Sequence, residues 1–176
     1  MKILKLNHIS LDIETFSTHQ NAVIVQIGAC KFNFNDGIAS KFLVNIDPNS
    51  GVKHGLHIEK STVAWWLKQD KAVIASLRDN PQPLPDALIQ LNNWIGLDNR
   101  QLIWSNGCVF DMGILRSNYE KCGIQRNWPY YNEMDFRTVS TLLDIKLSKG
   151  NTHNALEDAV NQAEQFIKLF DNVEVF

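Results

Sequence analysis

The sequence predicts an α/β fold in which helices flank a mixed sheet. The first third of the chain contains runs rich in Val, Ile and Phe that are separated by turn residues, as strands are. The remainder shows mainly helical periodicity, and one short apolar run interrupts it. A strand meander followed by a helix–strand–helix arrangement favours a mixed sheet covered by helices.

The strand-like runs cover residues 3–13, 22–35 and 38–46. Asn35-Asp36-Gly37 lies between the second and third runs and is a typical turn sequence. Because both connections between these three runs are short, we expect an antiparallel meander.

The helical part begins where Ser61 or Thr62 can cap a helix that runs through residue 67. Apolar residues at helical spacing predict further helices, and Gly123 is a suitable C-cap for one of them. The short apolar run is expected to be a fourth strand. These elements are a strand at 101–105 and helices at 85–97, 110–121, 134–143 and 154–170.

Length and composition suit a single domain over residues 1–176. No apolar run is long enough to cross a bilayer, and the charged N-terminal residues are not typical of a secretory signal. We therefore expect a cytoplasmic protein with no membrane partner. The net charge of −2 argues against a broad basic surface that coats long nucleic acid. It leaves open a metal centre that holds a few nucleotides. Three cysteines without CxxC spacing are expected to be reduced thiols.

Two acidic residues share one face of the first predicted strand. Side chains alternate along a strand, so the apolar residues at 9, 11 and 13 face a core while Asp12 and Glu14 face the other way. Two such carboxylates repel each other and are costly to bury unpaired, and a divalent cation between them removes both problems. A strand end whose acids face solvent would show the same pattern.

A third acid, Asp111, follows the predicted fourth strand and falls in the first turn of the next helix. An aspartate there can ligate a metal, or it can simply complement the helix dipole. The segment by itself leaves both interpretations open.

The last polar segment precedes the final helix. Asn154, followed three residues later by Glu157, forms a capping-box pattern. His153 is then the residue before the cap and Asp158 the fourth helical residue, two positions that normally meet across a helix start. This geometry predicts that His153 lies close to Asp158. An ordinary polar helix start with an exposed histidine is the alternative.

Taken together, the three segments resemble the motifs of the DEDDh, or DnaQ-like, 3′-5′ exonucleases. Asp12 and Glu14 match the first motif, Asp-x-Glu; Asp111 matches the second; His153 and Asp158 match the third, His-x4-Asp. The resemblance extends from Asp12 to the final helix. It implies an RNase H-like fold with a mixed five-stranded sheet, the first three strands antiparallel, in a single exonuclease domain over residues 1–176.

The same resemblance implies a mechanism with two Mg²⁺ or Mn²⁺ ions. Asp12 would bridge them, Glu14 and Asp158 would complete the site beside the nucleophile, and Asp111 would hold the second ion. His153 would act as the general base. The expected partner is single-stranded DNA or RNA with a free 3′ end, degraded to nucleoside 5′-monophosphates. Relatives of this kind are often homodimers, so a homodimer is one possible state, and the sequence leaves the oligomeric state open.

Some shorter stretches point to a smaller branch of the family. Residues 12–15 and 25–29, and Trp65-Trp66 with Gln69, are similar to the RNase AS-like and phage DexA-like exonucleases.

Four residues are candidates for substrate contact. Thr15 and Phe16 follow the first motif, where the family meets the terminal nucleotide, and Phe16 can stack on a base. Trp65 and Trp66 lie about 100° apart on a helix, so we expect one to pack inward and Trp66 to face the cleft. Partial burial of both by packing is the alternative. His54 lies in a loop-like His-Gly-apolar segment of the kind found near the substrate in the family.

Three rival functions fit parts of the pattern. An RNase H-like endonuclease or resolvase also uses clustered carboxylates, but the His-x4-Asp spacing favours an exonuclease. A non-catalytic nucleic-acid binding module would be expected to lack some of the acids, and all of them are present. A proofreading subunit would need a docking segment, and none is evident in the sequence.

Overall fold

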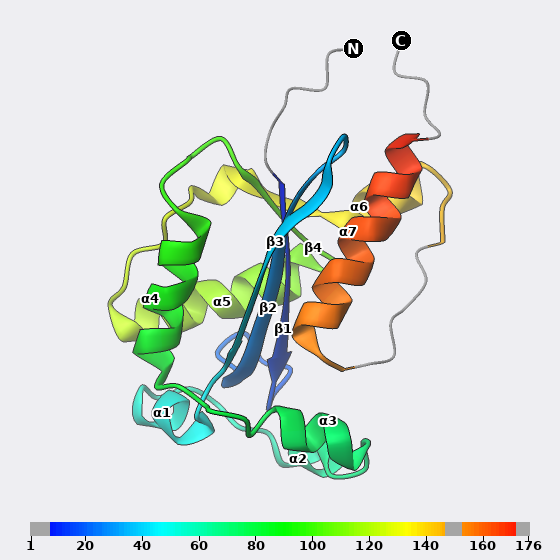
Figure 1. Ribbon diagram of the computed structural model, residues 1–176. Helices are drawn as coiled ribbons and strands as arrows, with labels where there is room; N and C mark the ends of the chain where they lie inside the picture. The colour runs from blue at the N-terminus through cyan, green and yellow to red at the C-terminus, as the bar shows by residue number, and fades with distance from the viewer. Residues whose placement is uncertain (1–7, 147–152, 172–176) are drawn as a thin grey trace.

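A computed structural model describes residues 8–146 and 153–171, and its centre is a five-stranded sheet (Figure 1). The sheet order is β3-β2-β1-β4-β5. β2 is antiparallel to β1 and to β3, whereas β4 is parallel to β1 and to β5. This confirms the expected mixed sheet and its antiparallel first three strands. The strands are β1 His8–Thr15, β2 Ile24–Asn33, β3 Gly37–Asn45, β4 Leu102–Ser105 and β5 Glu133–Asp135.

Helices cover both faces of the sheet. Figure 1 shows α4 and α5 on one side, α7 on the other, and α1 to α3 grouped beyond the end of β1. Within the described ranges, no helix has the length and hydrophobicity needed to cross a membrane. The helices are α1 Pro48–Lys53, α2 Lys60–Trp66, α3 Lys71–Ser76, α4 Leu84–Ile95, α5 Cys108–Cys122, the 3₁₀ turn η1 Tyr130–Asn132, α6 Phe136–Leu142 and α7 Ala155–Asp171.

The strand alternation of β1 decides which face of the sheet carries the acids. Ile9, Leu11 and Ile13 are buried in the larger core cluster, together with apolar residues of α4 and α5. Asp12 and Glu14 therefore lie on the opposite face, toward α7. The predicted division of this strand into an apolar and an acidic face is confirmed.

The start of α7 packs directly on β2. A Cβ atom placed on Gly28 would lie 2.1 Å from the backbone carbonyl carbon of Ala155 and 2.1 Å from the backbone nitrogen of Leu156. The buried Gln26 side chain accepts a hydrogen bond from the Ala155 amide at 2.8 Å and donates one to Asn45 at 2.8 Å. Glycine at position 28 therefore lets the helix lie against the strand, and the hydrogen bond to Gln26 holds the start of the helix there.

Several local predictions need correction. The helix through Trp66 begins at Lys60, with Glu59 at the N-cap position; Thr62 instead donates its hydroxyl to Glu59 at 2.8 Å. Of the helix predicted at 134–143, residues up to Asp135 belong to β5, which pairs with β4. The six-residue helices α1 and α3 were not predicted.

Other local predictions are confirmed. Gly123 ends α5 in the left-handed conformation, with φ of 66°. The turn before β3 is closed by Asn33, whose side-chain oxygen accepts hydrogen bonds from the amides of Asn35 and Asp36. Gly37 has φ of 76°. Residues 3–7 of the first predicted strand lie outside the described residues.

The contact at Gly28 leads to the first prediction. In Gly28→Ala, α7 must move away from β2, and we expect the free energy of unfolding to fall by about 1–3 kcal/mol through overpacking. Thermal unfolding followed by circular dichroism measures this change. Gly113→Ala is the control, because the new Cβ there would meet only the tip of the exposed Gln20 side chain, at 2.2 Å, which can rotate away. Equal losses in both variants would contradict a specific constraint at Gly28.

Candidate functional site

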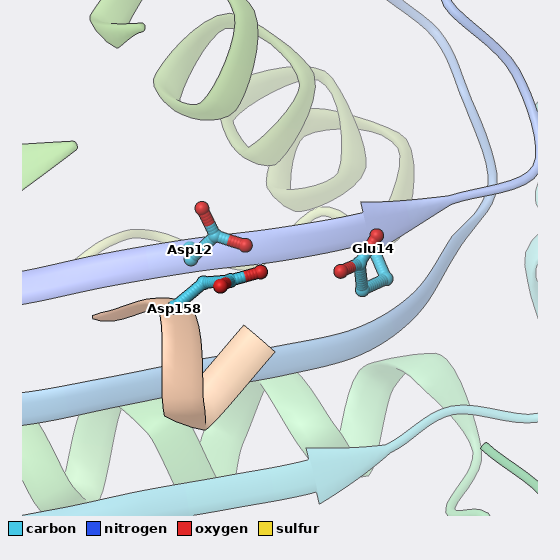
Figure 2. A group of neighbouring side chains, drawn as sticks. All are labelled: Asp12, Glu14 and Asp158. Atoms are coloured by element: carbon cyan, nitrogen blue, oxygen red, sulfur yellow. The ribbon is translucent and has the colours of Figure 1, made fainter. Parts of the chain in front are cut away.

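Three carboxylates meet where α7 crosses β1. Asp12 and Glu14 come from β1 and Asp158 from the first turns of α7 (Figure 2). One oxygen atom from each lies within 4.8 Å of the others, and all three residues are half-buried. Oxygen ligands at this separation suit a hard divalent cation such as Mg²⁺ or Mn²⁺.

The start of α7 places Asp158 in this group. Asn154 is the N-cap, as predicted, since its side chain accepts hydrogen bonds at 3.1 Å from the amides of Leu156 and Glu157. The Asp158 amide then bonds to the Asn154 carbonyl at 2.9 Å. Asp158 is thereby one turn inside the helix and on the face that packs against the sheet. Residues 151 and 152 of the predicted motif segment lie outside the described residues.

The acidic side chains repel one another when ionised, and this repulsion adds to the effect of burial on their pKa values. Burial, followed by the charges of Asp158 and Asp111, raises the pKa of Glu14 to about 8. Burial, followed by the charges of Asp111, Glu14 and Asp158, raises the pKa of Asp12 well above its usual value. Strong shifts of this kind in a cleft are typical of functional sites. A bound cation would stabilise the ionised forms that burial disfavours.

Asp111 lies beside the three carboxylates rather than among them. It is buried in the first turn of α5, and its charge contributes to the raised pKa values of Asp12 and Glu14. Burial raises its own pKa to about 7, against the lowering influence of Ser105, nearby backbone amides and Arg137. Asp111 is therefore a fourth acidic side chain close to the group.

His153 packs against Trp65 and Trp66 and has a rare backbone conformation. Its φ of 46° falls in the left-handed region that few residues with a side chain adopt. The ring lies edge-on to Trp65 at 4.9 Å and to Trp66 at 6.1 Å between centroids. Outlying backbone angles held by packing often mark functional positions. The expected contact between His153 and Asp158 stays a prediction.

A cavity of about 520 Å³ opens beside Glu14. Trp65 and Phe110, which come from α2 and α5, supply exposed aromatic surface to it. A cavity with aromatic walls next to a carboxylate cluster can hold a nucleotide base and its sugar. Its lining consists of Ile13, Glu14, Thr15, Thr18, Glu59, Ser61, Thr62, Trp65, Trp66 and Phe110.

The two tryptophans are oriented opposite to the prediction. Trp66 is 4% exposed and donates its indole N–H to the carbonyl of Thr15 at 2.9 Å, whereas Trp65 is 43% exposed. Trp66 therefore packs inward, although it is also among the residues that line the cavity. A buried indole N–H needs an acceptor, and the Thr15 carbonyl at the end of β1 provides it.

The other substrate candidates are placed as follows. Thr15 lines the cavity, although its hydroxyl is used in a hydrogen bond to the Ser17 carbonyl at 2.7 Å. Phe16 packs against the core and edge-on to Trp66 at 6.5 Å and is not among the residues that line the acidic cavity, so its role in base stacking stays a prediction. His54 ends α1 as its C-cap and does not line the cavity, so the structure does not support it as a substrate contact.

Three residues near the site were missed. Gln162 donates to Asp12 at 3.1 Å from the turn of α7 after Asp158, a spacing that could have indicated it. Phe110 directly precedes Asp111 in the sequence. Arg137 was not detectable, since its relation to Asp111 depends on how α6 and α5 begin side by side, with Asp135 accepting the Cys108 amide at 2.7 Å.

Solved structures with the same fold include nucleases. The nuclease domain of 3'hExo, a DEDDh family member bound to rAMP, is 12% identical with a TM-score of 0.68, over 100% of this chain and 98% of that chain. E. coli Exonuclease I in complex with a dT13 oligonucleotide is 14% identical with a TM-score of 0.66, over 94% of this chain but 43% of that chain. S. pombe Pop2p in its Mg²⁺- and Mn²⁺-bound form is 12% identical with a TM-score of 0.57, over 94% and 83%. These similarities confirm the RNase H-like fold.

The sequence itself matches a family model over almost its whole length. The model is described as the 3′-5′ exoribonuclease Rv2179c-like domain and covers residues 7–170. Among curated proteins, none matches the chain. The family match favours an exonuclease over the endonuclease and the non-catalytic module. The chain belongs to the 3′-5′ exoribonuclease Rv2179c-like family and is a 3′-5′ exonuclease.

Proposed function

We propose that this exonuclease removes nucleoside 5′-monophosphates from the 3′ end of single-stranded RNA, using two Mg²⁺ or Mn²⁺ ions. The observation that carries the proposal is the group of three carboxylates, whose oxygens lie within 4.8 Å of one another beside a cavity of nucleotide size. The family description names an exoribonuclease, which favours RNA over DNA. Structural neighbours bound to rAMP or to an oligonucleotide agree with a nucleic-acid substrate.

The donor set fits hard divalent cations. All ligands are carboxylate oxygens, and the cationic side chain that influences the acids most directly is Arg137, which acts on Asp111. The excess negative charge of Asp12, Glu14 and Asp158 is thus left for metal ions to balance. Zinc sites, by contrast, usually include Cys or His ligands.

The roles of the residues follow from their positions. Asp12, at the centre of the group, would be shared between two ions, Glu14 and Asp158 would hold one, and Asp111 the other. When bound, such ions stabilise the charge that develops on the phosphodiester and on the leaving 3′ oxygen. His153 would take the proton of the attacking water.

The substrate end would enter the cavity between α2 and α5. Trp65 and Phe110 present aromatic faces on which a base can stack without sequence preference. Trp65, Trp66 and Gln69 are also the basis for proposing the RNase AS-like and DexA-like branch. A cytoplasmic location and a homodimer stay predictions.

Digestion of matched single-stranded RNA and DNA tests the activity directly. With Mg²⁺ or Mn²⁺, 5′-labelled RNA should shorten one nucleotide at a time, faster than DNA, and release 5′-mononucleotides. Asp12→Asn should abolish turnover, because the shared ligand loses its charge, while circular dichroism stays unchanged. Internal cuts, or more than a few per cent activity in Asp12→Asn, would contradict the proposed site.

The raised carboxyl pKa values predict how pH affects the metal-free protein. Glu14, with an ordinary pKa of 4.5 and a folded value of about 8, holds a proton in the folded protein that the unfolded chain has lost. Its contribution to stability is therefore lost as pH rises through about 8. Between pH 7 and 9 in EDTA, we expect the Tm of the wild type to fall roughly 3–6 °C further than that of Glu14→Gln.

The pH range of this experiment avoids a competing group. Burial lowers the pKa of His8 to about 4, so His8 alters stability only below its ordinary value of 6.5. Added Mn²⁺ should remove most of the pH-dependent loss in the wild type. Parallel Tm curves for the two proteins would show that Glu14 is not protonated in the metal-free fold.

His153→Ala tests the general base. We expect the rate to fall about 10²–10⁴-fold and its pH dependence near neutrality to flatten, because proton removal no longer uses a side chain. His19→Ala serves as the control, since His19 is exposed and lies edge-on to His57, outside the cavity lining. An unchanged pH–rate profile in His153→Ala would remove this residue from the mechanism.

A further inference from the structure

The side chain of Gln162 donates a hydrogen bond to Asp12, the central carboxylate of the acidic group. Its Nε2 donates to Oδ1 of Asp12 at 3.1 Å, and the residue is 8% exposed. Gln162 lies four residues after Asp158 in α7, so both project from the same face of the helix. One helix therefore supplies a carboxylate of the group and a donor to its neighbour on β1.

The amide oxygen of Gln162, unlike its nitrogen, accepts no hydrogen bond from the described residues. This Oε1 atom is buried. A glutamine that only filled space would be expected to satisfy both ends, because a buried unpaired oxygen is unfavourable. The contact with Asp12 also fixes the orientation of the amide, since the reverse orientation would place its oxygen against a carboxylate oxygen.

The geometry points to Gln162 as a positioning residue that fixes the rotation of the Asp12 carboxylate for metal binding. A carboxylate oxygen accepts more than one hydrogen bond or metal bond, so the contact at Oδ1 leaves Oδ2 and a remaining lone pair of Oδ1 for cations. The donor is neutral. A lysine or arginine in its place would balance the charge of Asp12 and so compete with the metal, whereas an amide orients the group without neutralising it. This inference rests on the proposed metal site.

The test uses Mn²⁺ alone as the probe, in the absence of nucleic acid. Gln162→Met keeps the length and helix preference of the side chain but removes the amide. Isothermal titration should show a Kd for Mn²⁺ that is about 10–100-fold higher than that of the wild type, as expected when a hydrogen bond to a metal ligand is lost. Gln165→Met, the same change on the same helix outside the acidic group, should stay within about twofold.

A second readout separates positioning from folding. In Gln162→Met, the Mg²⁺ concentration for half-maximal activity should rise, while circular dichroism and Tm in EDTA stay close to the wild type. Gln162→Asn, whose shortened side chain retracts the amide from Asp12, should weaken Mn²⁺ binding in the same direction, so the test does not depend on one variant.

The outcomes distinguish the two proposals. An unchanged Kd for Mn²⁺ in Gln162→Met, with Asp12→Asn no longer binding the ion, overturns the role of Gln162 and leaves the metal site intact. Binding of Mn²⁺ by Asp12→Asn as tight as by the wild type overturns the metal site itself. The positioning role is supported if Gln162→Met binds Mn²⁺ with a Kd about 10–100-fold higher than the wild type, Asp12→Asn no longer binds the ion, and Gln165→Met is unaffected.

Discussion

The close approach of α7 to β2 at Gly28 is the constraint on which the site depends. Any larger residue would place its Cβ at 2.1 Å from the helix backbone. Because the helix can touch the strand, Asp158 reaches the face of β1 that carries Asp12 and Glu14. The buried Gln26 fixes the same end of α7 through the Ala155 amide, so both position and direction of the helix are determined beside the acids.

The site concentrates negative charge where the fold is most rigid. β1 is the central strand, paired on both sides, and its other face is buried in the main core. Burial and the neighbouring acidic charges raise the pKa of both Asp12 and Glu14, because the carboxylates lie close together and largely out of water. Rigid placement of this kind favours a metal-binding function, because ligands already in position lose little freedom when an ion binds.

Local and periodic features were predictable from the sequence. The two faces of β1 follow from its period of two, and the cap at Asn154 follows from side-chain chemistry within a few residues. Short elements were not predictable: β5 has three residues and α1 and α3 have six, too few to show a period.

Tertiary relations explain the remaining errors in the site. Helical spacing separates Trp65 from Trp66 but does not fix the rotation of α2 about its axis, which depends on the hydrogen bond from Trp66 to Thr15. Phe16 directly follows β1, yet the chain turns there and directs its ring toward the core. The spacing of four residues from Asp158 places Gln162 on the same helix face, but its partner Asp12 lies on β1, far away in the sequence, so the spacing does not identify that contact.

The acidic group also joins distant parts of the chain. Asp12 and Glu14 are made early during synthesis, while Asp158 is made only after every strand of the sheet. A partly synthesised chain therefore carries two of the three carboxylates and no helix to cover them. The three carboxylates can therefore come together only after α7 has been synthesised and has packed against the sheet.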